Sequence, residues 1–220
     1  MTELNPFLKE MLSAPGLSGF ESPIRAIIKD AWTPLTDELT VSKIGSLHGL
    51  KNGQGNDPRK RVLISAHMDA IGMMVTDIQD GLIRITEIGG IDHRILPGQP
   101  VTVHGRKDLP GLVVQPPRHL LPDAAGDGPV EMQYLLVDVG LRPKEADDLV
   151  RVGDTVSYAQ EPLELTGEAL AGHTLDNRVS VAAVTLCLEA LQSRIHDWDV
   201  WAVASAQEEE TLGGAFTSPF

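Results

Sequence analysis

The hydrophobic pattern of the N-terminal part of the chain predicts two helices followed by β-structure. Asn5-Pro6 pairs an N-cap residue with a proline at the first helical position, and Pro15 ends that helix. Ser22-Pro23 repeats the start signal, and the apolar positions behind it have helical spacing. These positions are Ile24, Ile27, Ile28 and Trp32. An extended stretch at 39–44 and a strand at Arg61–Ala66 follow, so this part has α/β character.

The middle of the chain has a different texture. From residue 71 to residue 165, glycine and proline separate short runs that are typical of β-strands. The clearest runs are Gly81–Ile85, Gln99–His104, Leu112–Val114, Tyr134–Val139 and Thr155–Tyr158. We therefore predict that residues 71–165 form a small all-β domain, either a barrel or a sandwich. The polar segment 116–129 is predicted to be an exposed loop.

The α/β pattern returns after residue 166. Residues 176–192 have apolar positions at helical spacing, and residues 199–206 form an almost wholly apolar run that suits a strand covered on both faces. A further helix is predicted to begin at 213–215. The predicted fold class is therefore α/β: a three-layer α/β/α domain of residues 1–70 and 166–220, interrupted by the β domain. Because the sequence stops soon after a central strand, we expect the α/β domain to be truncated at its C-terminus.

Composition narrows the choice of function. The formal net charge is −13, from 18 basic and 31 acidic side chains, and no basic patch of the kind that binds nucleic acid is present. No stretch is long and apolar enough to span a membrane, and the N-terminus has no export signal. Cys187 is the only cysteine, which favours a cytoplasmic setting, and its apolar helix predicts a buried thiol.

Two candidate site residues follow the first predicted strand. His67 and Asp69 are two positions apart, so on an extended backbone their side chains project to the same side. Histidine is a common metal ligand, and a nearby carboxylate often accepts the proton of its other ring nitrogen. The alternative is a hydrogen-bonded histidine in a turn, and this motif alone leaves both interpretations open.

Two further motifs supply carboxylates. Asp176 stands at the start of the predicted helix, where it could be an N-cap or a carboxylate that bridges two metals. Glu208 and Glu209 directly follow the apolar strand, at the edge of the sheet where α/β proteins bind ligands. Because they are adjacent, we expect them to point in different directions, one toward a metal and the other toward a proton. A solvated acidic loop is the alternative.

Together, the motifs predict a metal site. Histidine and carboxylate ligands suit Zn²⁺, Co²⁺ or Mn²⁺, and two such ions that share a carboxylate can lower the pKa of a water molecule toward neutrality. A carboxylate that is not a ligand can then act as general base and afterwards as acid to the leaving amine.

At these residues the sequence resembles the tetrahedral, or glutamyl (deblocking), aminopeptidases, a family of dinuclear metallopeptidases of which some members were also called endoglucanases. The resemblance extends along nearly the whole chain. It is carried by an ordered series of motifs: Pro15–Glu21, Ala66–Gly72, Ile88–Ile91, Leu96–Gln99, Leu175–Arg178 and Gln207–Glu209.

The resemblance implies a role for each candidate. His67 would bind one metal, Glu209 would bind the other and Asp176 would bridge them. Glu208 would be the general base, and Asp69 would orient His67. The family's remaining Asp and His ligands would lie beyond Phe220, so the two Zn²⁺ or Co²⁺ ions would be incompletely bound by this chain.

The resemblance also implies peptide substrates and a homo-oligomer built partly through the β domain. The leading hypothesis is therefore a metal-dependent aminopeptidase that hydrolyses N-terminal residues of peptides. The alternative is a catalytically inactive truncated homologue that serves as an assembly or binding module. Glycoside hydrolysis is disfavoured, because adjacent Glu208 and Glu209 do not flank a sugar bond naturally and His67 would have no role.

Overall fold

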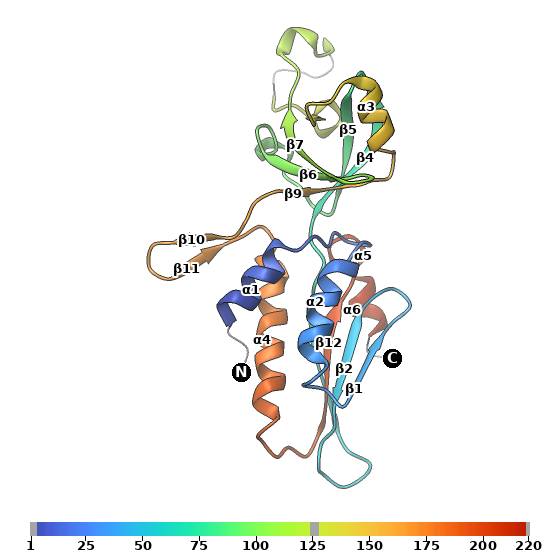
Figure 1. The fold of residues 1–220 in the computed structure, drawn as a ribbon. Helices are drawn as coiled ribbons and strands as arrows, with labels where there is room; N and C mark the ends of the chain where they lie inside the picture. The colour runs from blue at the N-terminus through green and yellow to red at the C-terminus, as the bar shows by residue number, and fades with distance from the viewer. Residues whose placement is uncertain (1–3, 124–127, 219–220) are drawn as a thin grey trace. The chain divides into compact units, whose positions relative to one another are not determined.

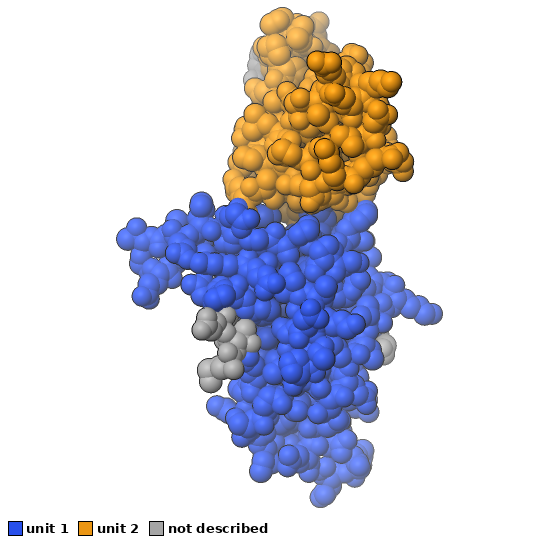
Figure 2. Space-filling view, viewed as in Figure 1, with its two compact units in different colours: residues 1–70, 161–220 blue, residues 71–160 orange. Residues whose placement is uncertain are grey.

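The computed structural model describes residues 4–123 and 128–218, and their contacts divide the chain into two units (Figure 2). Unit 1 comprises Met1–Ala70 and Glu161–Phe220, and unit 2 comprises Ile71–Gln160. The chain re-enters unit 1 at Glu161, ahead of the expected residue 166. The reason is that Glu161 accepts a hydrogen bond from Ser13 and Glu164 pairs with Lys9, which ties this segment to the first helix.

A four-stranded sheet forms the centre of unit 1. Its strands are β1 (Glu38–Val41), β2 (Leu47–Lys51), β3 (Arg61–His67) and β12 (Asp199–Ser205), in the order β1-β2-β12-β3. β12 is parallel to β3 and antiparallel to β2. All but one of the seven residues of β12 are buried, as expected for the apolar run in the sequence.

Three helices lie together against one face of this sheet: α1 (Leu4–Ser13), α2 (Ser22–Trp32) and α4 (Leu175–Leu191) (Figure 1). Their apolar faces and the sheet form one core. Its largest members are Phe7, Met11, Ile24, Ile28, Trp32, Leu47, Met68 and Leu188. Trp32 is fully buried, and its indole N–H donates to the hydroxyl of Thr185 at 2.8 Å, so its one polar atom is satisfied.

Two short helices follow β12: α5 (Glu208–Thr211), at the strand ends, and α6 (Gly213–Thr217), on the opposite face of the sheet. Ser218, at the end of α6, hydrogen-bonds the ring of His48 on β2, whereas the adjacent Leu47 packs into the core on the other side. Successive side chains of a strand face opposite ways, so α6 completes a third layer. Gly214 approaches Ala206 so closely that a Cβ atom would lie 2.4 Å from its carbonyl oxygen.

Several local expectations needed correction. Cys187 is exposed on α4 and not buried, because the buried side of that helix is the one that carries Val184 and Leu188. The N-cap position of α2 is Glu21 and not Ser22. A hairpin of β10 (Leu163–Leu165) and β11 (Ala169–Ala171), which the pattern did not indicate, precedes α4. The helix expected at 213–215 is confirmed as α6.

Unit 2 is a closed six-stranded barrel in the order β4-β5-β8-β7-β6-β9. Its strands are β4 (Gly72–Gln79), β5 (Leu82–Ile88), β6 (Pro100–His104), β7 (Asp108–Val114), β8 (Leu136–Asp138) and β9 (Thr155–Tyr158). Inward-facing aliphatic side chains fill it, among them Met73, Ile83, Val101, Val103, Val137 and Val156. The expected α/β fold with an inserted barrel is confirmed.

Short helices connect the strands of the barrel. They are η1 (His93–Ile95), η2 (Arg118–Leu120), η4 (Met132–Tyr134) and α3 (Pro143–Leu149). α3 was missed by the sequence pattern because it is short and only Ala146 is buried. Part of the expected loop 116–129, namely 124–127, lies outside the described residues. None of the described helices is long and apolar enough to cross a membrane.

Candidate metal centre

The candidate site lies where β3 and β12 end side by side. Their parallel pairing places His67 opposite Ser205, so the residues after each strand emerge at the same edge of the sheet. His67 is the last residue of β3, and α5 begins at Glu208, shortly after β12 ends. Gln207, between them, has a left-handed backbone (φ 57°) and turns the chain into α5.

His67 is enclosed by carboxylates. Its Nδ1 atom lies 3.2 Å from the carbonyl oxygen of Asp69 and 3.6 Å from Oδ1 of the same residue. Its Nε2 atom faces away from Asp69, at 3.1 Å from Oδ1 of Asp176 and 3.5 Å from Oε2 of Glu208. Nδ1 is thus paired with Asp69. Nε2 instead faces the carboxylates of Asp176 and Glu208, which are both acceptors for a single N–H.

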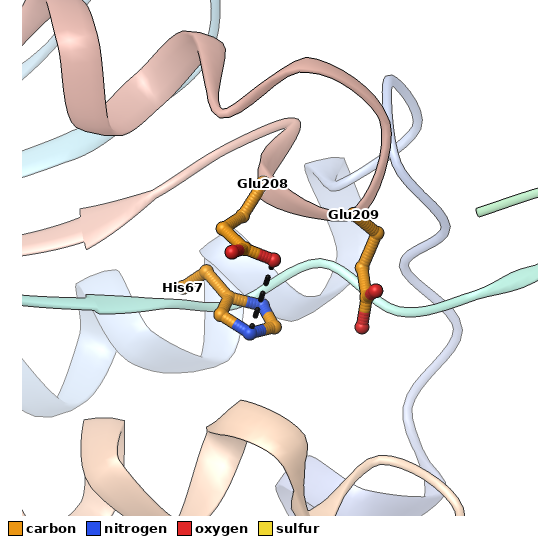
Figure 3. Close-up of side chains that lie close together, drawn as sticks. All are labelled: His67, Glu208 and Glu209. Carbon is orange, nitrogen blue, oxygen red and sulfur yellow. Dashed lines mark ion pairs between the residues drawn. The ribbon is translucent and has the colours of Figure 1, made fainter. Parts of the chain in front are cut away.

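Glu208 and Glu209 converge on this histidine. Figure 3 shows both side chains leaving α5 on the side of His67, with Glu208 over the ring and Glu209 beside it. Their directions differ, as expected for neighbours, yet one ligand atom from each of the three residues lies within 4.8 Å of the others. The three donors are thus close enough that small side-chain movements could bring them to a cation.

Asp69 is wholly buried and holds α5 in place. Its two carboxylate oxygens accept hydrogen bonds from the main-chain N–H groups of Glu208 and Glu209, both at 3.1 Å. Burial would raise the pKa of Asp69, but the hydrogen bonds from His67 and from these two amides lower it below its usual value. The ionised Asp69 therefore fixes both the histidine and the segment that carries the two glutamates.

Asp176 is placed differently from its neighbours. It is not the N-cap of α4, a position held by Thr174, and Asp176 and Asn177 have non-helical backbone angles at the start of that helix. Its side chain is 85% exposed and touches the ring of His67. The structure thus brings all five sequence-predicted site residues together around His67, although Asp176 stands outside the tight group of three.

A model of the family described as M42 glutamyl aminopeptidase matches residues 45–220 of the chain. The chain belongs to this family. Lysyl aminopeptidase of Pyrococcus furiosus is 32% identical in an alignment 219 positions long, which covers 97% of this chain and 62% of that protein. The chain therefore spans less than two thirds of the length of this relative.

Solved structures of M42-like peptidases match the fold. A TET aminopeptidase from Thaumarchaeota archaeon SCGC AB-539-E09 superposes with a TM-score of 0.90 at 28% identity, covering 99% of this chain and 62% of that one. The TET1 peptidase of Pyrococcus horikoshii, described as assembling into a tetrahedron or a large octahedral shell, gives 0.84 at 30% identity, with 97% and 64% covered.

The charges of this candidate site suit a cation. Burial alone would lower the pKa of His67, but Asp69, Glu208 and Asp176 raise it to about 9. The pKa of Glu209 is raised above its usual value, mainly by burial. The negative charges of Asp69, Glu208 and Asp176 raise it further, whereas the charge of His67 lowers it. The carboxylates thus crowd one another, and an imidazole with two carboxylates is a donor set that binds Zn²⁺, Co²⁺ or Mn²⁺. A bound cation would relieve the crowding.

One buried residue that supports the M42 site was missed by sequence reasoning. Arg178, on α4, is fully buried and donates from Nε to the carbonyl oxygen of Met68 at 3.0 Å. Its terminal nitrogens donate to the carbonyl oxygens of Met11, Ala14 and Gly16. Burial lowers the pKa of Arg178 to about 10, while the charge of Asp69 opposes that effect. The sequence did carry a signal for Arg178: it is a charged residue on the apolar side of a predicted helix.

Proposed function

We propose that the chain carries part of the active site of a metal-dependent aminopeptidase that removes N-terminal residues from peptides. The observation that carries this proposal is the convergence of His67, Glu208 and Glu209 within 4.8 Å at the strand ends. Membership of a family of aminopeptidases supports the reaction class. We further propose that two divalent ions, Zn²⁺ or Co²⁺, are the cofactors.

Each side chain has a proposed task in binding the metals. His67 and Glu209 would each hold one of the two metals, and Asp176, at the start of α4, would contribute to both. Asp69 keeps the ring of His67 oriented from the Nδ1 side and restrains the amides of α5. When bound, divalent cations supply Lewis-acid chemistry, polarising the scissile carbonyl and making water more acidic.

Glu208 is the proposed general base. Its side chain is about one-third exposed, so solvent and substrate can reach it, and its carboxylate lies over the face of the site that His67 presents (Figure 3). Glu208 accepts a proton from the attacking water and then returns it to the amine that leaves as the peptide bond breaks. Asp69 stays ionised and buried behind it and takes no proton.

The test compares two neighbouring glutamates. The purified full-length protein is incubated with amino-acid nitroanilides and Zn²⁺ or Co²⁺, with and without a chelator, as wild type, Glu208→Gln and Glu210→Gln. We expect chelator-sensitive release that falls by about 10²- to 10⁴-fold in Glu208→Gln, the typical contribution of a general base. Glu210 is exposed and should be replaceable. Release that ignores the chelator, or equal loss in both variants, would refute the proposal.

We also infer that the full-length protein forms a homo-oligomer in the cytoplasm. The P. horikoshii relative supports this inference, because it is described as assembling into a tetrahedron or a large octahedral shell, and the single cysteine suits a reducing compartment. Light scattering coupled to size exclusion measures the mass directly. An assembly of many copies is expected, and a monomer at all concentrations would contradict the inference.

A further inference from the structure

The segment that carries the two glutamates has its main-chain amides satisfied by side chains from distant parts of unit 1. The N–H of Ala206 donates to Ser46 Oγ at 3.2 Å, and the next N–H, of Gln207, donates to Glu21 Oε1 at 3.1 Å. The N–H groups of Glu208 and Glu209 donate to Asp69. Four successive amides, which α5 cannot satisfy internally, are therefore held from outside.

Glu21 is the charged member of this set without an assigned role. It is 3% exposed, and its Oε1 atom also accepts a hydrogen bond from the N–H of Gly19 at 2.7 Å. Although Glu21 is at the N-cap position of α2, its side chain makes no capping hydrogen bond to that helix. The carboxylate is directed to residues outside α2, and helix capping does not explain its burial.

The loop that presents Glu21 is anchored beside Asp69. The N–H of Ser18 donates to the carbonyl oxygen of Ala70 at 3.1 Å, and the N–H of Ala70 donates to that of Gly16 at 3.0 Å. Leu17 and Ala70 form an isolated parallel bridge. Glu21 and Asp69 thus lie on two backbone segments that are hydrogen-bonded to each other. Their carboxylates accept hydrogen bonds from the consecutive N–H groups of residues 207–209.

We infer that Glu21 is a positioning residue for the proposed metal site. Gln207 has the left-handed backbone that turns the chain from β12 into α5, a conformation that is uncommon for a residue with a side chain. The hydrogen bond from its N–H to a buried carboxylate holds that turn. Glu21 thereby sets the direction in which Glu208 and Glu209 leave the backbone, without itself touching a cation or a substrate.

The expected effect of Glu21 on metal affinity rests on the proposed function, but its hydrogen bond to Gln207 does not. Groups that orient ligands from behind typically change metal affinity by about 10- to 100-fold when they are removed. Glu21→Ala should therefore weaken Zn²⁺ binding at least about tenfold. Glu21→Gln keeps an oxygen acceptor and should recover much of the affinity. Glu38→Ala removes an exposed glutamate of the same unit and should leave affinity unchanged.

The experiment measures two quantities on the same proteins: Zn²⁺ affinity by calorimetry, and amide hydrogen exchange of residues 206–209 without metal. We expect Glu21→Ala to lose affinity and to exchange faster at Gln207, while the amides of β3 keep their protection. Unchanged exchange at Gln207 in Glu21→Ala or, if that variant does not fold, in Glu21→Met, which keeps the length of the side chain but has no acceptor, would overturn the inference. If wild type binds no Zn²⁺, the proposed function fails, and the exchange data still decide the role of Glu21.

Discussion

Replacing Arg178 with methionine tests how the structure around the site is held together. The guanidinium is fully buried and serves four carbonyl oxygens, those of Met11, Ala14, Gly16 and Met68. It thus joins the end of α1 and the loop after it to the residue that follows His67. Methionine has a similar length but no donor, so the variant leaves these acceptors buried without their partner.

The structure bounds the size of the effect. A hydrogen bond to a charged group contributes about 1.5–3 kcal/mol net to stability. The sum of four such bonds would overestimate the loss in Arg178→Met, because burying the guanidinium itself costs several kcal/mol. We expect a net loss of about 3–5 kcal/mol, the range found when one partner of a buried charged contact is removed. Since a chain of this size loses about 2–4 °C per kcal/mol, Tm should fall by about 6–20 °C.

The assay is urea unfolding followed by tryptophan fluorescence. All three tryptophans, Trp32, Trp198 and Trp201, belong to unit 1, so the signal reports the unit that contains Arg178 and not the barrel. Arg194→Met, which removes an exposed arginine just after α4, is the matched control and should change stability by less than about 0.5 kcal/mol. A loss below about 1 kcal/mol in Arg178→Met would refute the reasoning.

Three further predictions concern unit 1. Gly214→Ala should destabilise it by about 1–3 kcal/mol in urea, because the added Cβ would meet Ala206. Burial, with a smaller effect from Arg178, lowers the pKa of His173 to about 4. Between about pH 6.5 and 4 the unfolded chain therefore binds more protons there, so stability falls as pH falls, and His173→Gln should weaken that dependence. Cys187, which is exposed, should react with an aromatic disulfide reagent in the folded chain.

Each of these predictions has a control or a reference. Gly172→Ala should be tolerated, since its nearest contact is a side-chain atom at 3.4 Å, and equal losses at the two glycines would contradict the steric argument. Wild type is the reference for the pH dependence, and a slope of stability against pH that is unchanged in His173→Gln would contradict the assignment. If the thiol reacts only after urea is added, Cys187 is covered in the folded chain and the prediction is wrong. Cys187→Ser, which has no thiol, gives the background signal.

Much of the fold could be predicted because its signals are local. The apolar run of β12 and the helical spacing in α2 and α4 reflect burial that each segment shows by itself. The second hairpin of unit 1 and α3 could not be predicted in this way. β10 is wholly exposed, and α3 buries a single alanine, so neither has a hydrophobic pattern to find.

The candidate site could also be predicted in part. His67 and the pair Glu208 and Glu209 follow strands, and parallel strands that end together bring such residues to one edge. The partners of Glu21 and Arg178 were not predictable, because they are main-chain atoms far away in sequence. The backbone at Asp176 was also hidden, since an Asp at a helix start predicts a cap and gives no sign of non-helical angles.

The most direct test of the metal site is Zn²⁺ binding measured by calorimetry on the purified chain and on His67→Ala, with His48→Ala as the control histidine. The structure predicts that the wild type and His48→Ala bind Zn²⁺ alike, and that His67→Ala binds it at least about tenfold more weakly. Equal affinity in all three proteins, or no binding by the wild type, would contradict the claim that His67 is a ligand in a metal site.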